Sequence, residues 1–201
     1  MDDAQAAVSF GADYLGLIFV PNSPRCVTFE AASAIIKEFD DRVTIVGVFK
    51  DTNPTDVDIT VSALGLSAVQ YHGAESPETC TFTTQATIKA FELSESLTAE
   101  FINTYTNSVD YILLDRSKKD PDKDIKSLIT IASNLVSRHR EFPPCFYAGG
   151  LTPENVKEVI TTVRPYAVDV ASGVESSPGK KDIQKLKQFC QAVKETSLCN
   201  H

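Results

Sequence analysis

The sequence contains no tryptophan, a single methionine and no apolar run approaching the roughly 18 residues that a membrane-spanning helix needs. Its five cysteines show neither a Cys-x-x-Cys pair nor the His/Cys spacing of a zinc site. Positive charge is also scarce, since 19 lysines and arginines stand against 27 aspartates and glutamates, which gives a net charge of −8. These absences argue against a membrane partner, a bound metal and nucleic acid as the main ligand. An anionic small molecule remains compatible, because a local binding site can oppose the overall field.

Cysteine usage and chain length set the expected compartment and the number of domains. An odd number of cysteines without a pairing pattern is simplest to explain in a reducing, cytoplasmic compartment. The segment Met1–Asp3 is not the beginning of a signal peptide. With 201 residues and no linker or shift in composition, the chain is expected to form a single domain over residues 1–201.

Helix-like and strand-like segments alternate along the whole chain. The expected strands are short and apolar, at residues 14–20, 43–49, 68–71, 86–91, 109–114, 145–148 and 167–170. The expected helices cover residues 3–10, 29–39, 54–64, 97–105, 125–139 and 183–194, with two more beginning at about 76 and 153. Strands that are apolar on both faces and alternate with helices indicate a parallel sheet covered by helices.

Two successive strands end in glycine and other small residues. The run 145–148 leads into two glycines, and the run 167–170 leads into Ala171, a serine and a glycine. After the first turn, Thr152 occupies the expected helix N-cap and Pro153 the first helical position. Glycine allows close approach of the backbone to a ligand, and helix N-termini attract anions. Either turn alone could be an ordinary glycine turn, but together they predict a phosphate site at Gly149, Gly150, Ser172 and Gly173.

The numbers of elements leave two folds open. A (βα)₈ barrel requires eight strands, whereas the sequence shows eight helices and seven strands and begins with a helix. An open doubly wound sheet could use seven strands. The barrel is favoured because barrels bind phosphate at the turns after their last two strands. The predicted fold is therefore α/β, a (βα)₈ TIM barrel lacking the first β-strand.

Four polar residues beyond the phosphate turns follow or end the predicted strands, where barrel enzymes gather their functional groups. Arg25 could bind a carboxylate, or it could be a solvated loop arginine. His72 could orient or polarise a substrate oxygen, although a histidine in a turn is more often structural. Asp115 ends an apolar strand, where partial burial favours a general acid, but it could also cap a helix or pair with Lys118 or Lys119. Asp169 is expected within its strand, bonded to neighbouring backbone.

The residues together carry a resemblance to a known family. GADYLGLIF, PNSPR, VGVF, VQYHG, LLD, AGGLTPENV, RPYAVDVASGVE and PGKKD resemble phosphoribosylanthranilate isomerase in order and spacing, over about residues 3–193. The resemblance implies a cofactor-free barrel enzyme of tryptophan biosynthesis that acts on a phosphoribosylated anthranilate. It implies an Amadori rearrangement, in which an acid opens the ribose ring to a Schiff base and a base then removes the C2 proton. It leaves other tryptophan-pathway domains open as partners.

The resemblance also implies roles for particular residues. Asp115 in LLD matches the general acid, and Arg25 in SPR matches the residue that binds the anthranilate carboxylate. Gln70 and His72 match a QLHG motif that lines the pocket, with Tyr71 in place of the usual leucine. The implied substrate-binding set is Arg25, Gln70, His72, Gly149, Gly150, Asp169, Ser172 and Gly173.

Two features depart from the family pattern. The family base is a cysteine in a K-x-C-G segment on the first strand, whereas this sequence begins within the helix that follows that strand. Cys26 lies in a loop, and Cys145 begins its strand, so neither is an obvious substitute. A glycine-poor segment, RSKKDPDKDIKSL, replaces the usual glycine-rich loop after LLD. We therefore expect impaired turnover, with a non-catalytic phosphosugar-binding or interaction protein as the alternative; a different phosphosugar enzyme would leave Arg25 and QYHG unexplained.

Overall fold

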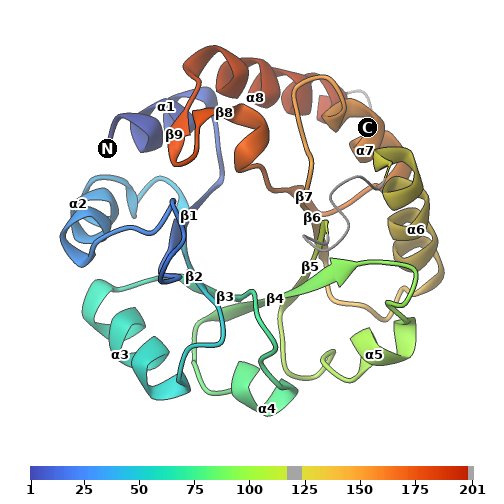
Figure 1. Cartoon of the computed structure of the whole chain (residues 1–201), viewed down its shortest axis with the longest axis horizontal. Helices are drawn as coiled ribbons and strands as arrows, with labels where there is room; N and C mark the ends of the chain where they lie inside the picture. The colour runs from blue at the N-terminus through green and yellow to red at the C-terminus, as the bar shows by residue number, and fades with distance from the viewer. Residues whose placement is uncertain (117–123, 199–201) are drawn as a thin grey trace.

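The computed structural model describes residues 1–116 and 124–198 and shows strands arranged in a ring with helices outside it (Figure 1). Seven parallel strands form one curled sheet in which each strand is hydrogen-bonded to the next along the chain. The strands are β1 (Tyr14–Ile18), β2 (Thr44–Phe49), β3 (Ala68–Tyr71), β4 (Ala86–Leu93), β5 (Tyr111–Arg116), β6 (Cys145–Tyr147) and β7 (Ala167–Val168). The predicted parallel α/β sheet is confirmed.

Helices follow or precede each strand on the outside of the ring (Figure 1). They are α1 (Asp2–Phe10), α2 (Phe29–Phe39), α3 (Pro54–Leu64), α4 (Pro77–Cys80), α5 (Ala99–Asn103), α6 (Ile125–Arg138), α7 (Val156–Val163) and α8 (Ile183–Leu198). A 3₁₀ turn (Ser172–Val174) leads into a small antiparallel hairpin of β8 (Glu175–Ser177) and β9 (Lys180–Lys181), which the sequence patterns did not predict. No described helix is long and apolar enough to cross a membrane.

Helix α2 illustrates why these segments are helical. The Thr28 side chain caps it by accepting from Ala31 N at 3.2 Å. Its buried side chains recur at the spacing of one helix face, and they pack between the helix and the sheet. These buried residues are Ala32, Ile35, Ile36 and Phe39.

Two predicted boundaries are wrong. Helix α7 begins at Val156 rather than at Pro153, because the preceding turn continues and Asn155 closes it. The Asn155 side chain accepts from Thr152 N at 2.8 Å and donates to Gly150 O at 2.8 Å, so Asn155 rather than Thr152 is the helix N-cap. Asp169 lies just beyond the short strand β7 rather than within it, although its N–H still bonds to Tyr147 O at 2.9 Å.

The ring has two apolar layers. Side chains that point inward form a small cluster in the lumen: Val46, Ala68, Ile88, Ala90, Leu113, Phe146 and Ala148. A larger cluster lies between the strands and the surrounding helices, and it contains most of the buried aliphatic and aromatic residues. This division explains why the strands are apolar on both faces.

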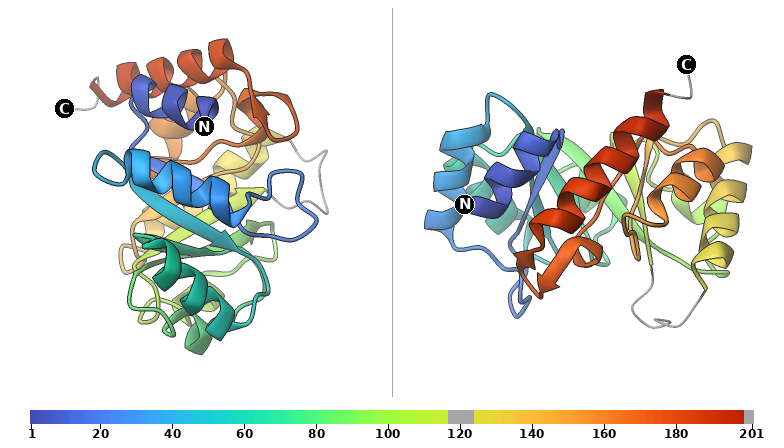
Figure 2. Two further views of the ribbon diagram at one scale, coloured as in Figure 1. Left: turned by 90° about the vertical axis from the view of Figure 1, so that its left-hand side faces the viewer. Right: turned by 90° about the horizontal axis from the view of Figure 1, so that it is seen from above.

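The sheet is not closed between its first and last strands, and we call this interval the seam. Among the described residues, β1 pairs with β2 alone and β7 with β6 alone. Outside the seam, α1 and α8 lie side by side (Figure 2), and a Cβ atom on Gly11 would approach Lys194 Nζ to 2.5 Å. Across it, the hydroxyl oxygens of Tyr14 and Tyr166 are 3.5 Å apart. Two sheet edges therefore face each other without a shared ladder.

Candidate functional site

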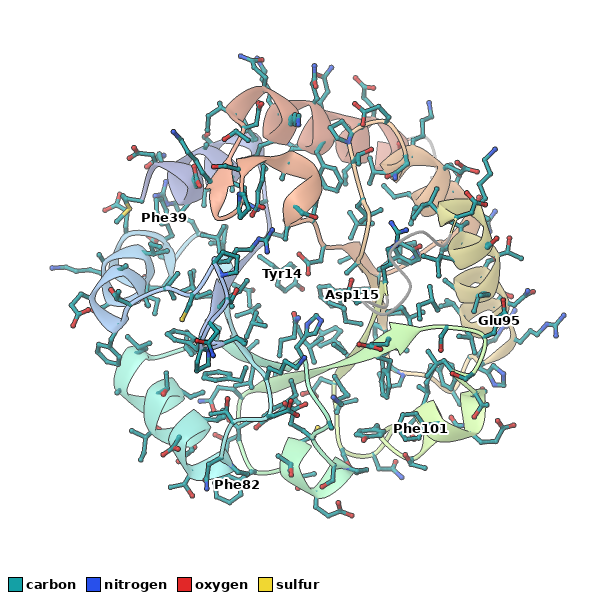
Figure 3. All side chains as sticks on the ribbon, in the orientation of Figure 1. Tyr14, Phe39, Phe82, Glu95, Phe101 and Asp115 are labelled. Atoms are coloured by element: carbon teal, nitrogen blue, oxygen red, sulfur yellow. The ribbon has the colours of Figure 1, made fainter. Side chains whose placement is uncertain are left out.

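A hydrogen-bonded chain of three polar side chains lies at the carboxyl ends of β3 and β5. Gln70 Nε2 lies 2.8 Å from His72 Nδ1, and His72 Nε2 lies 2.9 Å from Asp115 Oδ2. Gln70 is almost fully buried, whereas His72 and Asp115 are partly exposed. Asp115 points toward the interior of the ring (Figure 3). Parallel strands bring together residues that are 43 positions apart, as the barrel interpretation predicted.

The orientation of the Gln70 amide and the position of the hydrogen on the His72 ring depend on each other. An amide N–H that donates to Nδ1 requires this nitrogen to be unprotonated, so in the neutral ring Nε2 carries the hydrogen. This N–H then donates to the Asp115 carboxylate. If Asp115 is protonated, the opposite set of bonds forms: Asp115 donates to Nε2, and Nδ1–H donates to the Gln70 amide oxygen after the amide rotates. Both arrangements leave all three groups paired.

The two glycine turns, at Gly149–Gly150 and at Gly173, lie beside each other, and the first is next to Asp115. Gly149 and Gly150 have φ of 80° and 73°, in the left-handed region that favours glycine. A Cβ atom on Gly149 would come within 2.5 Å of Asp115 Oδ1, and one on Gly173 would lie 1.7 Å from Leu151 O. The predicted phosphate turns are therefore adjacent, with Ser172 exposed in the 3₁₀ turn.

Arg25 reaches this edge through a bidentate ion pair that the sequence patterns missed. Its Nε and Nη2 donate to the two Glu175 carboxylate oxygens at 2.7 and 2.6 Å. Lys181 Nζ lies 3.8 Å from Glu175 Oε1, so two positive charges surround one negative charge. Arg25 Nη1 has no hydrogen bond within the described part of the chain. The Arg25, Glu175 and Lys181 side chains together carry a charge of +1, and guanidinium N–H groups of Arg25 remain available to a ligand carboxylate.

The β8–β9 hairpin holds Arg25 in this place. Glu175 follows the 3₁₀ turn by one residue, and its pKa is lowered because Arg25 donates hydrogen bonds to its carboxylate. At the tip of the hairpin Gly179, with φ of 82°, lies so close to the Arg25 loop that a Cβ atom would be 2.7 Å from Pro24 O. Lys181 contributes a further contact, from Nζ to Ala171 O at 3.0 Å. The arginine loop and the second glycine turn are therefore connected.

Asp169 lies between these two groups. The residue is exposed as a whole. The protein around its carboxyl group nevertheless displaces water from the carboxylate, which raises the pKa of Asp169. The nearby Asp115 carboxylate raises this pKa further, whereas His72 and Lys181 oppose the shift. Its carboxyl group therefore lies within electrostatic reach of Asp115, His72 and Lys181, while its N–H bonds to the backbone of β6.

The structure thus brings every predicted site residue to one edge of the ring.

The base expected from the family pattern has no counterpart among the described cysteines. Cys80 and Cys145 are buried, and burial raises the pKa of their thiols to about 11 and about 12. Cys26 is exposed in its loop, and the pKa of Cys190 is also raised by burial. Residues 1–116 and 124–198 contain no metal-binding group of three or more His, Cys, Asp or Glu. Lys118 and Lys119, the alternative partners for Asp115, lie outside the described residues, as does most of the charged segment after it.

Glu175 was missed because its role depends on Arg25, a partner 150 positions away in the sequence. The only local signal was a lone glutamate two residues after Gly173, which could equally have been a solvated surface residue.

Comparison with known proteins gives consistent results. A family model described as N-(5′-phosphoribosyl)anthranilate (PRA) isomerase matches residues 1–192. An N-(5′-phosphoribosyl)anthranilate isomerase of Geobacter sulfurreducens is 38% identical over 194 residues, covering 96% of this chain and 94% of the relative. The isomerase of Myxococcus xanthus is 37% identical over 205 residues, covering 98% and 93%.

Solved structures match as closely. Phosphoribosyl anthranilate isomerase from Thermotoga maritima superimposes with a TM-score of 0.87 at 36% identity, over 96% of this chain and 94% of that one. A second structure, phosphoribosyl anthranilate isomerase in complex with reduced 1-(o-carboxyphenylamino)-1-deoxyribulose 5-phosphate, gives a TM-score of 0.83 at 36% identity, over 96% and 93%.

Proposed function

This chain belongs to the N-(5′-phosphoribosyl)anthranilate isomerase family, the isomerases of tryptophan biosynthesis, and we propose how its residues serve that reaction. The proposed substrate is N-(5-phosphoribosyl)anthranilate, rearranged to 1-(2-carboxyphenylamino)-1-deoxyribulose 5-phosphate. The observation that carries the proposal is the Asp115–His72 hydrogen bond of 2.9 Å beside the glycine turns. This substrate needs a proton donor between a phosphate site and a carboxylate site, and this edge of the ring offers all three.

Asp115 acts as the general acid. Its proton passes to the ribose ring oxygen as the C1–O bond breaks, which leaves a Schiff base. A base then takes the C2 proton, and the resulting enolamine tautomerises to the ketone. His72 and Gln70 allow Asp115 to release and regain its proton without an unpaired group, because their hydrogen bonds can reverse direction. A positioned acid of this kind contributes about 10²–10⁴-fold to the rate.

The two ends of the substrate bind on either side of Asp115. The 5-phosphate lies against the turns at Gly149, Gly150, Ser172 and Gly173, where the absence of side chains lets backbone groups approach it. The anthranilate carboxylate binds the N–H groups of Arg25 that Glu175 leaves available. Asp169 faces the sugar between them. Among the predicted set, Gln70 acts through His72 rather than by touching the substrate.

The ring is proposed to be a (βα)₈ barrel in which the seam marks the place of a first strand. The unpaired edges of β1 and β7, with α1 packed on α8 outside them, support this interpretation. The family's base is proposed to belong to that strand as well, since Cys80 and Cys145 are buried, Cys190 lies in the outer helix α8 and Cys26 lies in the Arg25 loop. Turnover by the chain as given is therefore proposed to be slow.

The remaining features follow from the same interpretation. Residues 1–201 are proposed to form one domain, since one sheet runs through the described chain. The compartment is proposed to be the cytoplasm, because all four described cysteines are free thiols. Contacts with other tryptophan-pathway domains remain a prediction.

A second candidate is a phosphosugar-binding protein without catalysis on the same barrel. The open seam favours it, because a general base is worth about 10²–10⁴-fold and none of the described cysteines supplies one. This candidate predicts tight, saturable binding of the reduced product analogue with no turnover.

A strand-extended form separates the two candidates. It carries a first strand from a relative, with its K-x-C-G segment, fused ahead of Asp2, and a matched control carries Ala in place of that cysteine. We expect the extended form to convert the substrate at least about 100-fold faster than the chain as given, and the control to stay slow. We also expect it to rescue a tryptophan auxotroph that lacks this step. Binding of the analogue without turnover in both forms would instead support the second candidate.

A further inference from the structure

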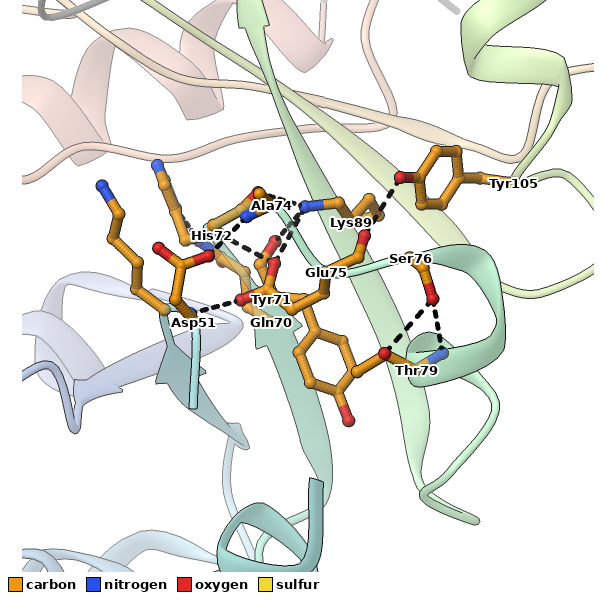
Figure 4. A network of polar contacts seen from close by, with 12 residues as sticks. Asp51, Gln70, Tyr71, His72, Ala74, Glu75, Ser76, Thr79, Lys89 and Tyr105 are labelled. Carbon is orange, nitrogen blue, oxygen red and sulfur yellow. Dashed lines mark hydrogen bonds and ion pairs between the residues drawn. The ribbon is translucent and has the colours of Figure 1, made fainter. Parts of the chain in front are cut away.

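A second polar network lies under the turn that carries His72, on the side of the sheet that faces the helices (Figure 4). Lys89, in the middle of β4, points away from the lumen, and its Nζ lies 3.0 Å from Glu75 Oε2. Each side chain is only 3% exposed. Removing two charges from water costs several kcal/mol per ion unless partners replace the lost hydration. Such a pair therefore needs an explanation.

Lys89 directs its ammonium group at the backbone on both sides of His72. It bonds to Gly73 O at 2.7 Å and approaches Tyr71 O at 3.5 Å, in addition to the Glu75 carboxylate. The three ammonium protons therefore have three acceptors. Two of those acceptors are the carbonyl groups of the residues that flank His72 in the chain.

Glu75 bonds to backbone N–H groups of the same region. Its Oε1 accepts from Asp51 N at 2.7 Å, and its Oε2 accepts from Gly73 N at 2.9 Å. The backbone carbonyl of Glu75 accepts from the Tyr105 hydroxyl at 3.0 Å. The pair thus joins strand β4, the turn after β3 and the turn after β2.

Backbone hydrogen bonds and close packing hold the turn after β3 in one conformation. Ala74 N donates to Asp51 Oδ1 at 2.7 Å, and His72 N donates to Phe49 O at 2.8 Å. A Cβ atom on Gly73 would lie 2.3 Å from the Asp51 carboxylate, so only glycine fits there. His72 is thereby held by its own backbone, by both neighbouring residues and by the Glu75 carboxylate, three residues further along the chain.

Stability alone is a weak explanation for this arrangement. Buried ion pairs can often be replaced by apolar residues without loss of stability. Here most partners of the pair are main-chain atoms of the turn that contains His72. The His72 ring is the side chain that this turn presents to Asp115. Misplacement of a catalytic group by about 1 Å can cost about 100-fold in rate.

We propose that the Lys89–Glu75 pair is a positioning device that holds His72 in register with Asp115. The inference rests on the proposed function, since it deepens the role of the same acid. Neither residue touches the substrate; both act through the backbone of the His72 turn.

The test replaces the pair by neutral side chains of similar size, Lys89→Met together with Glu75→Gln, so that no buried charge is left alone. In the strand-extended form we expect kcat to fall about 100-fold with KM little changed. In a His72→Asn background the same double change should cost little more, because the residue that it positions is already gone. A purely structural role would lower the rate by the same factor in both backgrounds, and this result would overturn the inference.

A second measurement does not depend on turnover. The sequence has three histidines, so ¹⁵N-labelled histidine gives a simple spectrum of the His72 ring. Asp115→Asn should shift its ring nitrogens in the parent chain and shift them less in the neutral pair. Equal nitrogen shifts in the parent chain and in the neutral pair would overturn the inference. If the expected shifts are seen but the strand-extended form has no turnover, only the proposed reaction is refuted.

An exposed ion pair between Glu38 and Arg42 provides the control. Glu38→Gln with Arg42→Met removes an exposed pair whose Nη2–Oε1 distance is 3.7 Å, and it should change neither readout. If the neutral pair does not fold, Glu75→Asp keeps the charge but shortens its reach. Glu75→Asp should then lower kcat as expected for the neutral pair, and it should reduce the effect of Asp115→Asn on the His72 ring nitrogens. A kcat and a nitrogen shift equal to those of the parent would overturn the inference.

Discussion

Two regions of the ring differ in how their polar groups are paired. At the carboxyl ends of β3–β5, which we call the paired arc, His72, Asp115, Glu75 and Lys89 each have hydrogen-bond partners on a neighbouring strand or turn. At the seam, β1 and β7 lack a shared ladder, and Tyr166 is 57% exposed. The comparison teaches that Asp115, the proposed proton donor, is held by hydrogen bonds within its own region of the ring. At the seam, by contrast, the backbone hydrogen-bonding groups on the outer edges of β1 and β7 have no partner strand in the described sheet.

Replacing the proton donor is expected to have the largest effect. Asp115→Asn keeps the shape of the side chain but removes its acidic proton, so kcat should fall by about 10²–10⁴-fold in the strand-extended form. Binding of the reduced product analogue should change much less, because the phosphate and carboxylate ends bind elsewhere. Asp56→Asn, on the exposed face of α3, is the control and should leave kcat unchanged. Turnover near the parent rate would remove Asp115 from the mechanism.

A methyl group at Gly173 tests the second glycine turn, on the side of the seam. Gly173→Ala places Cβ 1.7 Å from a backbone oxygen that cannot move without the turn, so we expect a loss of about 3 kcal/mol. For a chain of this length, this corresponds to a melting temperature lower by about 6–12 °C. Gly65→Ala is the control, since its φ is 70° but nothing lies within 4 Å, and it should cost about 1 kcal/mol. A loss at Gly173 no larger than the loss at Gly65 would show that the backbone around Leu151 O yields to the added methyl group.

The ion pair beside the seam should show itself in the pH dependence of stability. Arg25 lowers the pKa of Glu175 below its ordinary value of 4.5, so the pair stabilises the fold above that pH. This contribution is lost as the pH falls through the lowered value. Glu175→Gln should therefore cost about 2 kcal/mol at pH 7 and much less at about pH 3. Chemical denaturation at both pH values measures this, and a pH-independent cost would contradict the ion-pair explanation.

The smallest expected effect sharpens the description of the paired arc. The Tyr71 hydroxyl is buried without a hydrogen-bond partner in the described structure, and burial raises its pKa to about 12. Tyr71→Phe should therefore stabilise the protein by about 1 kcal/mol. Tyr105→Phe is the matched control, because its hydroxyl donates to Glu75 O at 3.0 Å and its loss should destabilise by a similar amount. Thermal unfolding of both variants distinguishes an orphaned hydroxyl from a paired one.

Local patterns in the sequence were sufficient to predict the order of the helices and of the seven strands of the main sheet, and the polar residues that follow those strands. Asp115, Gln70 and His72 could be found because each lies at the end of an apolar run, and parallel strands place such ends at one edge. The helix N-cap at Thr152 was wrong because Asn155 satisfies the backbone of the glycine turn from within the chain. The β8–β9 hairpin was missed because its two short strands carry no apolar alternation.

The sequence by itself determined which segments become strands and where glycine lets the backbone turn, because these properties depend on residues within a few positions of each other. Only the tertiary structure decided that Arg25 pairs with Glu175 and that Lys89 supports the turn of His72. These partners are 150 and 16 positions apart, and their meeting depends on how the sheet curls and which turns it brings together. How closely the edges of β1 and β7 approach is decided in the same way, because it depends on the curvature of the whole ring and not on either segment alone.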